Sequence, residues 1–139
     1  FGAHGPKARG LELEFATLGE VLQENGYRPA TFGKWHIGDQ EDTRPHNRGF
    51  DETCGLMYSN DMWLHHPENP DYWGQWPLQY WENGEVTIDT VQVEDQKMLT
   101  TWYTEQAVDF IKRSKDEPFF VYVPHSMPHA PIICSEASG

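Results

Sequence analysis

The stretch that decides the fold runs from residue 26 to residue 38 and reads GYRPATFGKWHIG. Upstream of it, Thr17 and Glu20 have the spacing of a capping box and precede an apolar helical face, which predicts a helix that Gly26 ends. The chain then enters a short strand over residues 28–32, which stops at Gly33. A helix that leads into a buried strand is the repeating unit of an α/β protein.

A second unit of this kind lies near the other end of the sequence. Residues 101–113 place apolar side chains at helical spacings, and residues 118–123 form a continuous apolar strand. Two such units predict an α/β fold with a mostly parallel sheet flanked by helices. Two central strands are too few for such a sheet, so we expect further strands from elsewhere in the protein.

The region between the two units is less regular. Residues 39–77 are rich in Asp, Asn, Gly, Pro, His and Trp without sustained period, which predicts long ordered loops. Residues 78–93 alternate around Asn83-Gly84, which predicts an inserted β-hairpin. The sequence shows no internal repeat and no domain boundary. The abrupt start at Phe1 and the unpatterned residues 135–139 suggest a segment of a longer chain. We therefore interpret residues 1–139 as one partial domain of a longer protein.

Composition excludes several classes of function. The 139 residues carry 22 acidic and 10 basic side chains, a net charge of −12, so neither nucleic acid nor an anionic membrane surface is an expected partner. No run of about 18 apolar residues predicts a membrane span. Aromatic residues make up 14%, which argues against a disordered acidic segment. Two cysteines, Cys54 and Cys134, are too few for a disulfide framework.

The candidate site residues follow the two predicted strands, because ligands of parallel sheets bind beyond the carboxyl ends of strands. Lys34 and His36 lie two positions apart after the first strand and would project to one side if extended, as an oxyanion clamp would require. His129 follows the second strand between two prolines that restrict its backbone, which suits an acid catalyst. Ordinary surface residues would give the same pattern.

Other candidates have simpler interpretations. His125 and His129 have a metal-pair spacing only on a helix, which the prolines disfavour. His65-His66 would point to opposite faces of an extended segment, so we do not expect a shared ligand role. Four tryptophans in the middle of the chain suit either a sugar-stacking platform or the packing of long loops, and packing is the commoner use; they are Trp63, Trp73, Trp76 and Trp81.

Residues 26–38 closely resemble the second signature of the type I, formylglycine-dependent sulfatases. Residues 17–22 resemble the helix that precedes this signature in the family, and residues 48–51 and 58–61 resemble stretches that follow it. The 81–86 hairpin and residues 118–131 are also similar to family members, so the resemblance covers nearly the whole chain.

The resemblance implies an alkaline-phosphatase-like fold and a sulfuric ester hydrolase, with a hydrated formylglycine nucleophile and Ca²⁺. Lys34 would then contact the sulfate and the formylglycine. His36 would accept a proton from the diol, and His129 would bind sulfate and protonate the leaving oxygen. Ser59 matches a serine near the site of some arylsulfatases. The substrate would be a small-molecule or carbohydrate sulfate ester, and the protein would work outside the cytoplasm, in the periplasm, the lysosome or the medium.

The sequence departs from the family pattern at the nucleophile and the metal. Neither Cys54 nor Cys134 lies in a C-x-P-x-R motif, and the acidic calcium ligands are absent, so both are expected outside this chain. Residues 1–139 alone are therefore expected to be inactive. Two alternatives stay open: a phosphate or phosphonate ester hydrolase of the same superfold, and a non-catalytic carbohydrate-binding remnant.

Overall fold

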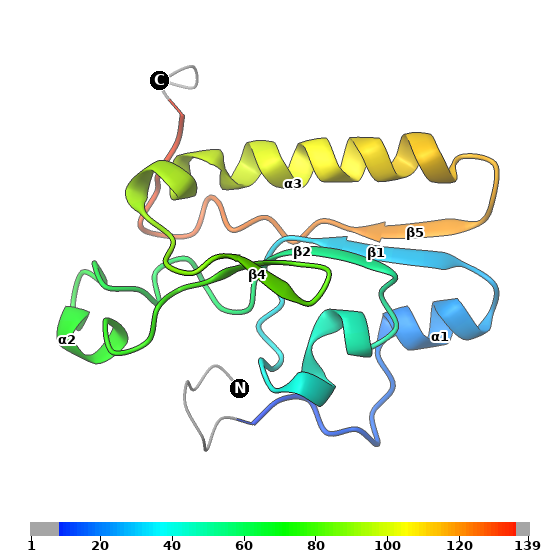
Figure 1. Ribbon diagram of the computed structural model, residues 1–139, viewed down its shortest axis with the longest axis horizontal. Coiled ribbons are helices and arrows are strands. Elements are labelled where there is room, and N and C mark those ends of the chain that lie inside the picture. The colour runs from blue at the N-terminus through cyan, green and yellow to red at the C-terminus, as the bar shows by residue number, and fades with distance from the viewer. Residues whose placement is uncertain (1–8, 136–139) are drawn as a thin grey trace.

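A five-stranded sheet with helices on both faces forms the body of the protein. The computed structural model describes residues 9–135, and Figure 1 shows α3 covering one face of the sheet while α1 lies on the other. In chain order the elements are α1 (Leu18–Glu24), β1 (Arg28–Phe32), the 3₁₀ helices η1 (Glu41–Thr43) and η2 (Pro45–Asn47), β2 (Glu52–Leu56), α2 (Pro70–Trp73), β3 (Tyr80–Glu82), β4 (Glu85–Ile88), α3 (Val93–Ser114) and β5 (Phe119–Tyr122).

The strand order is β4-β3-β2-β1-β5, and the sheet is mixed. β1 pairs in parallel with β2 and with β5, whereas β2–β3 and β3–β4 are antiparallel. The predicted α/β fold and both helix–strand units are therefore confirmed. The hairpin is also confirmed, with Asn83 and Gly84 at φ 47° and 88° in its turn, and it extends the sheet through β2.

The prediction of loops throughout residues 39–77 is wrong at β2. This strand contains Thr53, Cys54 and Gly55 and has no apolar run long enough to mark it, so its pairing with both neighbours selects it. Gly55 has a φ of 135°, and a Cβ at this position would lie 2.0 Å from the carbonyl oxygen of Gly33. The chain after β1 therefore passes β2 at a distance that only glycine permits.

The two helices differ from the sequence prediction in detail. The capping box of α1 is present: the Glu20 amide donates to Thr17 Oγ1 (3.1 Å), and the Thr17 amide donates to Glu20 Oε2 (2.6 Å). Leu18 and Val21 are nevertheless exposed rather than packed. α3 begins at Val93 rather than at residue 101, because its first turns are too polar to show an apolar spacing.

The main core lies between α3 and the sheet. Phe32 of β1 meets Phe110 of α3 edge to face at 5.9 Å, and both are buried with Leu99 and Tyr103. In the part of the chain that the structure describes, no helix combines the length and apolar character needed to cross a bilayer.

A buried ion pair fixes the loop before β2 to α1 on the opposite face. Arg48 is 1% exposed. Its Nε donates to Glu20 Oε1 at 2.7 Å, and its Nη atoms donate to the carbonyls of Leu11 (3.1 Å) and Phe15 (2.7 Å). One guanidinium thus links the loop before β2 to α1 and to the stretch that precedes α1.

Candidate functional site

The candidate site lies where the parallel strands end. Figure 1 shows β1, β2 and β5 pointing in one direction, so the chain leaves all three at the same edge of the sheet. The Lys34 amide donates to the Pro124 carbonyl (2.8 Å), which follows β5, and the His36 amide donates to the Met57 carbonyl (2.9 Å), which follows β2. The segment that carries Lys34 and His36 is therefore held on both sides.

His36 has a backbone conformation that is rare for a residue with a side chain. Its φ is 59°, in the left-handed region that costs a non-glycine residue free energy. Its ring packs against the ring of Tyr58 in a T-shaped arrangement, with the two ring centres 6.0 Å apart. Such strain is found most often at functional sites, where neighbouring contacts hold it.

The electrostatic neighbours of His36 include Lys34, Asp61 and His129. Burial is the main cause of a lowered pKa of His36, the Lys34 ammonium lowers it further, and the Asp61 carboxylate opposes both. An imidazole with a pKa below its ordinary 6.5 is neutral at pH 7 and can accept a proton. Lys34 and His129 thus both act electrostatically on His36.

His129 lies in a turn that is fixed by backbone contacts. Its amide donates to the Ser126 carbonyl at 3.1 Å, and Ser126 is itself buried, with its hydroxyl 3.3 Å from that of Tyr103 on α3. The Met127–Pro128 and Ala130–Pro131 peptide bonds on either side of it are cis. The imidazole is exposed, and its Nδ1 lies 2.7 Å from the Ala130 carbonyl oxygen.

Asp61 is the site residue to which the sequence analysis gave no role. Its Oδ1 lies 3.9 Å from His129 Nδ1, and its Oδ2 lies 3.8 Å from His66 Nε2. A carboxylate in a polar loop is common, and no motif of the sequence set this one apart. Its place between two imidazoles comes from tertiary structure alone.

The turn that carries Asp61 also contains Ser59 and Asn60, both buried. Ser59 Oγ makes no hydrogen bond within the described residues. Asn60 exchanges hydrogen bonds with Gln96 of α3: its Nδ2 donates to Gln96 Oε1 (3.2 Å), and Gln96 Nε2 donates to its carbonyl (2.9 Å). The turn is therefore anchored to the long helix.

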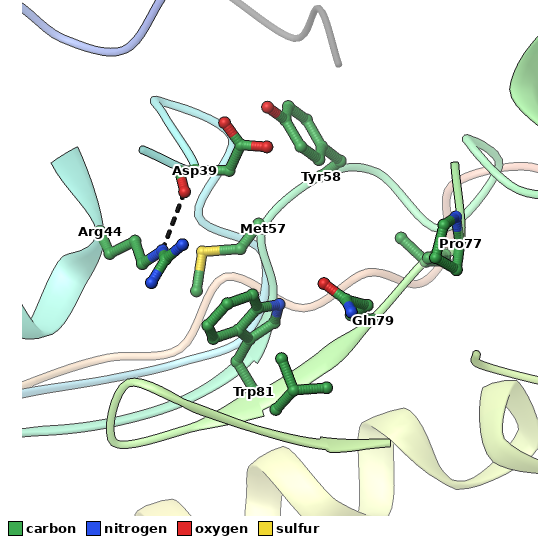
Figure 2. Close-up of a pocket in the computed structure, with 9 residues that line it drawn as sticks. Asp39, Arg44, Met57, Tyr58, Pro77, Gln79 and Trp81 are labelled. Atoms are coloured by element: carbon green, nitrogen blue, oxygen red, sulfur yellow. Dashed lines mark hydrogen bonds between the residues drawn. The ribbon is translucent and has the colours of Figure 1, made fainter. Parts of the chain in front are cut away.

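A pocket of about 250 Å³ opens beside this site, and Figure 2 shows Arg44 and Trp81 facing each other across one side of it. The Arg44 guanidinium lies 4.4 Å from the centre of the Trp81 ring, and its Nε donates to the Asp39 carbonyl at 2.8 Å. Tyr58 lines the pocket and also contacts His36. Lys34, His36 and His129 are not among the residues that line it.

The remaining candidates serve mainly to pack the loops. Trp63 is 3% exposed, and Trp73 packs against the core and stacks on His66. His65 meets the Trp63 ring edge-on at 4.9 Å. Trp81 is the tryptophan that reaches the pocket.

Neither cysteine has the environment of a nucleophile, and both are free. Cys54 is buried in β2, and burial raises the pKa of its thiol to about 12. Cys134 is exposed, outside any motif of the expected kind. Between residues 9 and 135 no group of three or more His, Cys, Asp or Glu side chains could hold a metal ion.

Comparison with known proteins gives a consistent result. The sulfatase family model matches residues 2–137. Arylsulfatase G of Rattus norvegicus is 34% identical over 147 residues, which cover 88% of this chain and 27% of that protein. The chain thus spans about a quarter of the length of this curated relative.

Two solved structures are similar over 94% of the chain. The PsFucS1 sulfatase from Pseudoalteromonas sp. superposes with a TM-score of 0.77 at 22% identity, and the match covers 31% of its chain. Ps i-CgsB in complex with k-i-k-neocarrahexaose superposes with a TM-score of 0.61 at 26% identity, and the match covers 30% of its chain.

Proposed function

Because this chain belongs to the sulfatase family, we propose that residues 1–139 are part of the catalytic domain of an enzyme that hydrolyses sulfate esters. The observation that carries the proposal is the backbone hydrogen bond from the Lys34 amide to the Pro124 carbonyl (2.8 Å), which joins the segment of Lys34 and His36 to the segment that leads to His129. Lys34 and His129 also act electrostatically on His36. A cation and two imidazoles at one edge of a sheet suit a tetrahedral oxyanion and the charge that develops on its oxygens.

Each of these side chains has a proposed role that its environment supports. Lys34 supplies a fixed positive charge to the sulfuryl oxygens. His36, whose pKa is lowered mainly by burial, is neutral at pH 7 and accepts a proton. His129 is exposed and gives a proton to the leaving oxygen. Ser59 lies in the turn beside them, and its buried hydroxyl is available to a substrate oxygen.

The nucleophile and the metal are proposed to come from outside the described residues. In the family, a formylglycine provides the nucleophilic hydroxyl and Ca²⁺ its electrostatic support. The residues described here do not form a calcium site, and Cys54 is buried with a pKa of about 12. The chemistry of residues 9–135 is accordingly limited to charge stabilisation and proton transfer.

The proposed substrates are sulfated carbohydrates or aryl sulfates. One similar structure, Ps i-CgsB, was solved with a bound neocarrahexaose, a sugar by its name. The pocket lined by Arg44 and Trp81 offers a cation and an aromatic ring close to Tyr58, which suits a polar ring with anionic substituents. The proposed location is outside the cytoplasm, as the resemblance implies.

Turnover by the full-length protein that contains these residues tests the proposal. We expect hydrolysis of 4-nitrophenyl sulfate to be faster than that of 4-nitrophenyl phosphate. The opposite order would favour a phosphate or phosphonate ester hydrolase, and sugar binding without any turnover would favour a carbohydrate-binding remnant. Turnover by residues 1–139 alone would contradict the proposed external nucleophile.

A further inference from the structure

We propose that Asp61 is a positioning residue for His129, which holds the imidazole turned so that its Nε2 gives the proton to the leaving oxygen. The inference rests on the proposed function, because it concerns the proton donor of that reaction. The proposed function gives the Asp61 side chain no role of its own.

Two oxygen atoms lie near Nδ1 of His129. The Ala130 carbonyl oxygen lies 2.7 Å from this nitrogen, and a carbonyl can only accept, so Nδ1 carries a hydrogen in that contact. Asp61 Oδ1 lies 3.9 Å from the same nitrogen. Two oxygen acceptors therefore face Nδ1, and Nε2 is the nitrogen left for proton exchange.

One oxygen of the Asp61 carboxylate lacks a partner within residues 9–135. Asp61 Oδ1 is buried and has no hydrogen-bond partner among the described residues. A buried carboxylate oxygen without a partner is costly, and a nearby positive charge compensates it. The His129 ring, whose Nδ1 lies 3.9 Å away, faces the oxygen that lacks a partner.

His66 occupies the other side of the carboxylate in a fixed tautomer. Its Nδ1 accepts hydrogen bonds from the amides of Glu68 (3.2 Å) and Asn69 (3.1 Å), so its ring hydrogen is on Nε2, 3.8 Å from Asp61 Oδ2. The ring also stacks on Trp73 at 5.8 Å. His66 thus orients Asp61 from one side and leaves Oδ1 for His129.

A shared anchor holds the two partners together. Asn60, next to Asp61, donates from Nδ2 to the Pro131 carbonyl at 3.3 Å, two residues after His129. The same side chain is bound to Gln96 of α3. Because the turn and the His129 segment are bound to each other and to one helix, the distance between carboxylate and imidazole is set by rigid elements.

The proton transfer accompanies displacement at sulfur. As the nucleophile from outside the described residues bonds to sulfur, the S–O ester bond breaks and its electron pair passes to the leaving oxygen, which takes the proton from Nε2 of the His129 imidazolium; the ring becomes neutral and keeps its hydrogen on Nδ1. The Asp61 carboxylate lies on the Nδ1 side of the ring, away from the nitrogen that gives the proton. An alkoxide leaving group needs the proton, whereas a nitrophenolate leaves readily without one.

The test compares two esters in the full-length enzyme. We expect Asp61→Asn to lower kcat about 100-fold for an alkyl or sugar sulfate but less than about 10-fold for 4-nitrophenyl sulfate, because general-acid catalysis contributes on the order of 10²- to 10⁴-fold. Asp61→Glu should restore part of the loss on the alkyl ester. The control is Asp71→Asn, an exposed carboxylate of α2, which should lower neither rate.

The two possible failures differ. Equal losses on both esters, or no loss on either, would overturn the positioning role of Asp61 while the proposed function stands. A wild-type enzyme that hydrolyses neither ester would refute the proposed function and with it this inference.

Discussion

Replacing Gly55 with alanine tests whether the close passage of two backbones positions the site. The new Cβ would lie 2.0 Å from the Gly33 carbonyl oxygen, and the φ of 135° is one that side-chain-bearing residues rarely adopt. The backbone conformation costs about 1–3 kcal/mol, and the steric overlap costs about 1–3 kcal/mol more. Gly55→Ala is therefore expected to destabilise the protein by about 2–6 kcal/mol. Because Gly33 precedes Lys34, any relaxation moves that ammonium as well.

Gly26→Ala is the matched control. Gly26 also has a positive φ, 81°, but a Cβ there would meet no atom within 4 Å, so only the conformational cost of roughly 1 kcal/mol remains. Urea unfolding followed by far-UV circular dichroism measures both variants, and turnover of 4-nitrophenyl sulfate by the full-length enzyme reports on the site. Equal destabilisation by the two substitutions would refute the argument from close approach.

Three further predictions concern other parts of the molecule. Lys34→Ala and His129→Ala in the full-length enzyme should each lower kcat by about 10²- to 10³-fold with unchanged circular dichroism, since each removes a charge-stabilising or proton-donating group; kinetics close to wild type would contradict the assignment. Arg48→Met should cost about 2–3 kcal/mol in urea unfolding at pH 7, the range for loss of hydrogen bonds to a charged group. The hydrogen bond from Arg48 lowers the pKa of Glu20 below its ordinary 4.5, so this stabilisation is complete above pH 4.5 and is lost as the pH falls through the lowered pKa; a stability difference that does not shrink in acid would argue against the pair. Iodoacetamide should leave Cys54 unmodified in the native protein and alkylate it in urea, because burial raises the pKa of its thiol to about 12; mass spectrometry of the native sample would show a modified Cys54 if this is wrong.

The sequence predicted those parts of the fold that local patterns specify. The Thr17 capping box, the Asn83-Gly84 turn and the apolar run at residues 118–123 each mark an element that the structure contains. β2 was missed because a strand that contains Thr53, Cys54 and Gly55 is stabilised by its two neighbours rather than by its own composition. Its existence depends on pairing, which a single pass along the chain does not detect.

The candidate site also contains residues that the sequence pattern identifies and one that only the tertiary structure identifies. The positions of Lys34, His36 and His129 follow from a rule of parallel sheets, and the two strands that precede them end at the same edge of the sheet. Asp61 could not be singled out, because its relation to His129 depends on a turn that Asn60 ties to a distant helix. Its role stays a proposal, as do the roles of the other three residues.

β5 lies at the outer edge of the sheet in Figure 1, and within residues 9–135 it pairs only with β1. Its remaining backbone amides and carbonyls face outward next to Phe120 and to Tyr122, which is 49% exposed. An extended segment of another chain, including a second copy of this one, can pair with such an unpaired edge strand. When residues 9–135 are purified on their own, they should associate into oligomers through β5 as the concentration rises. Tyr122→Lys should prevent this association.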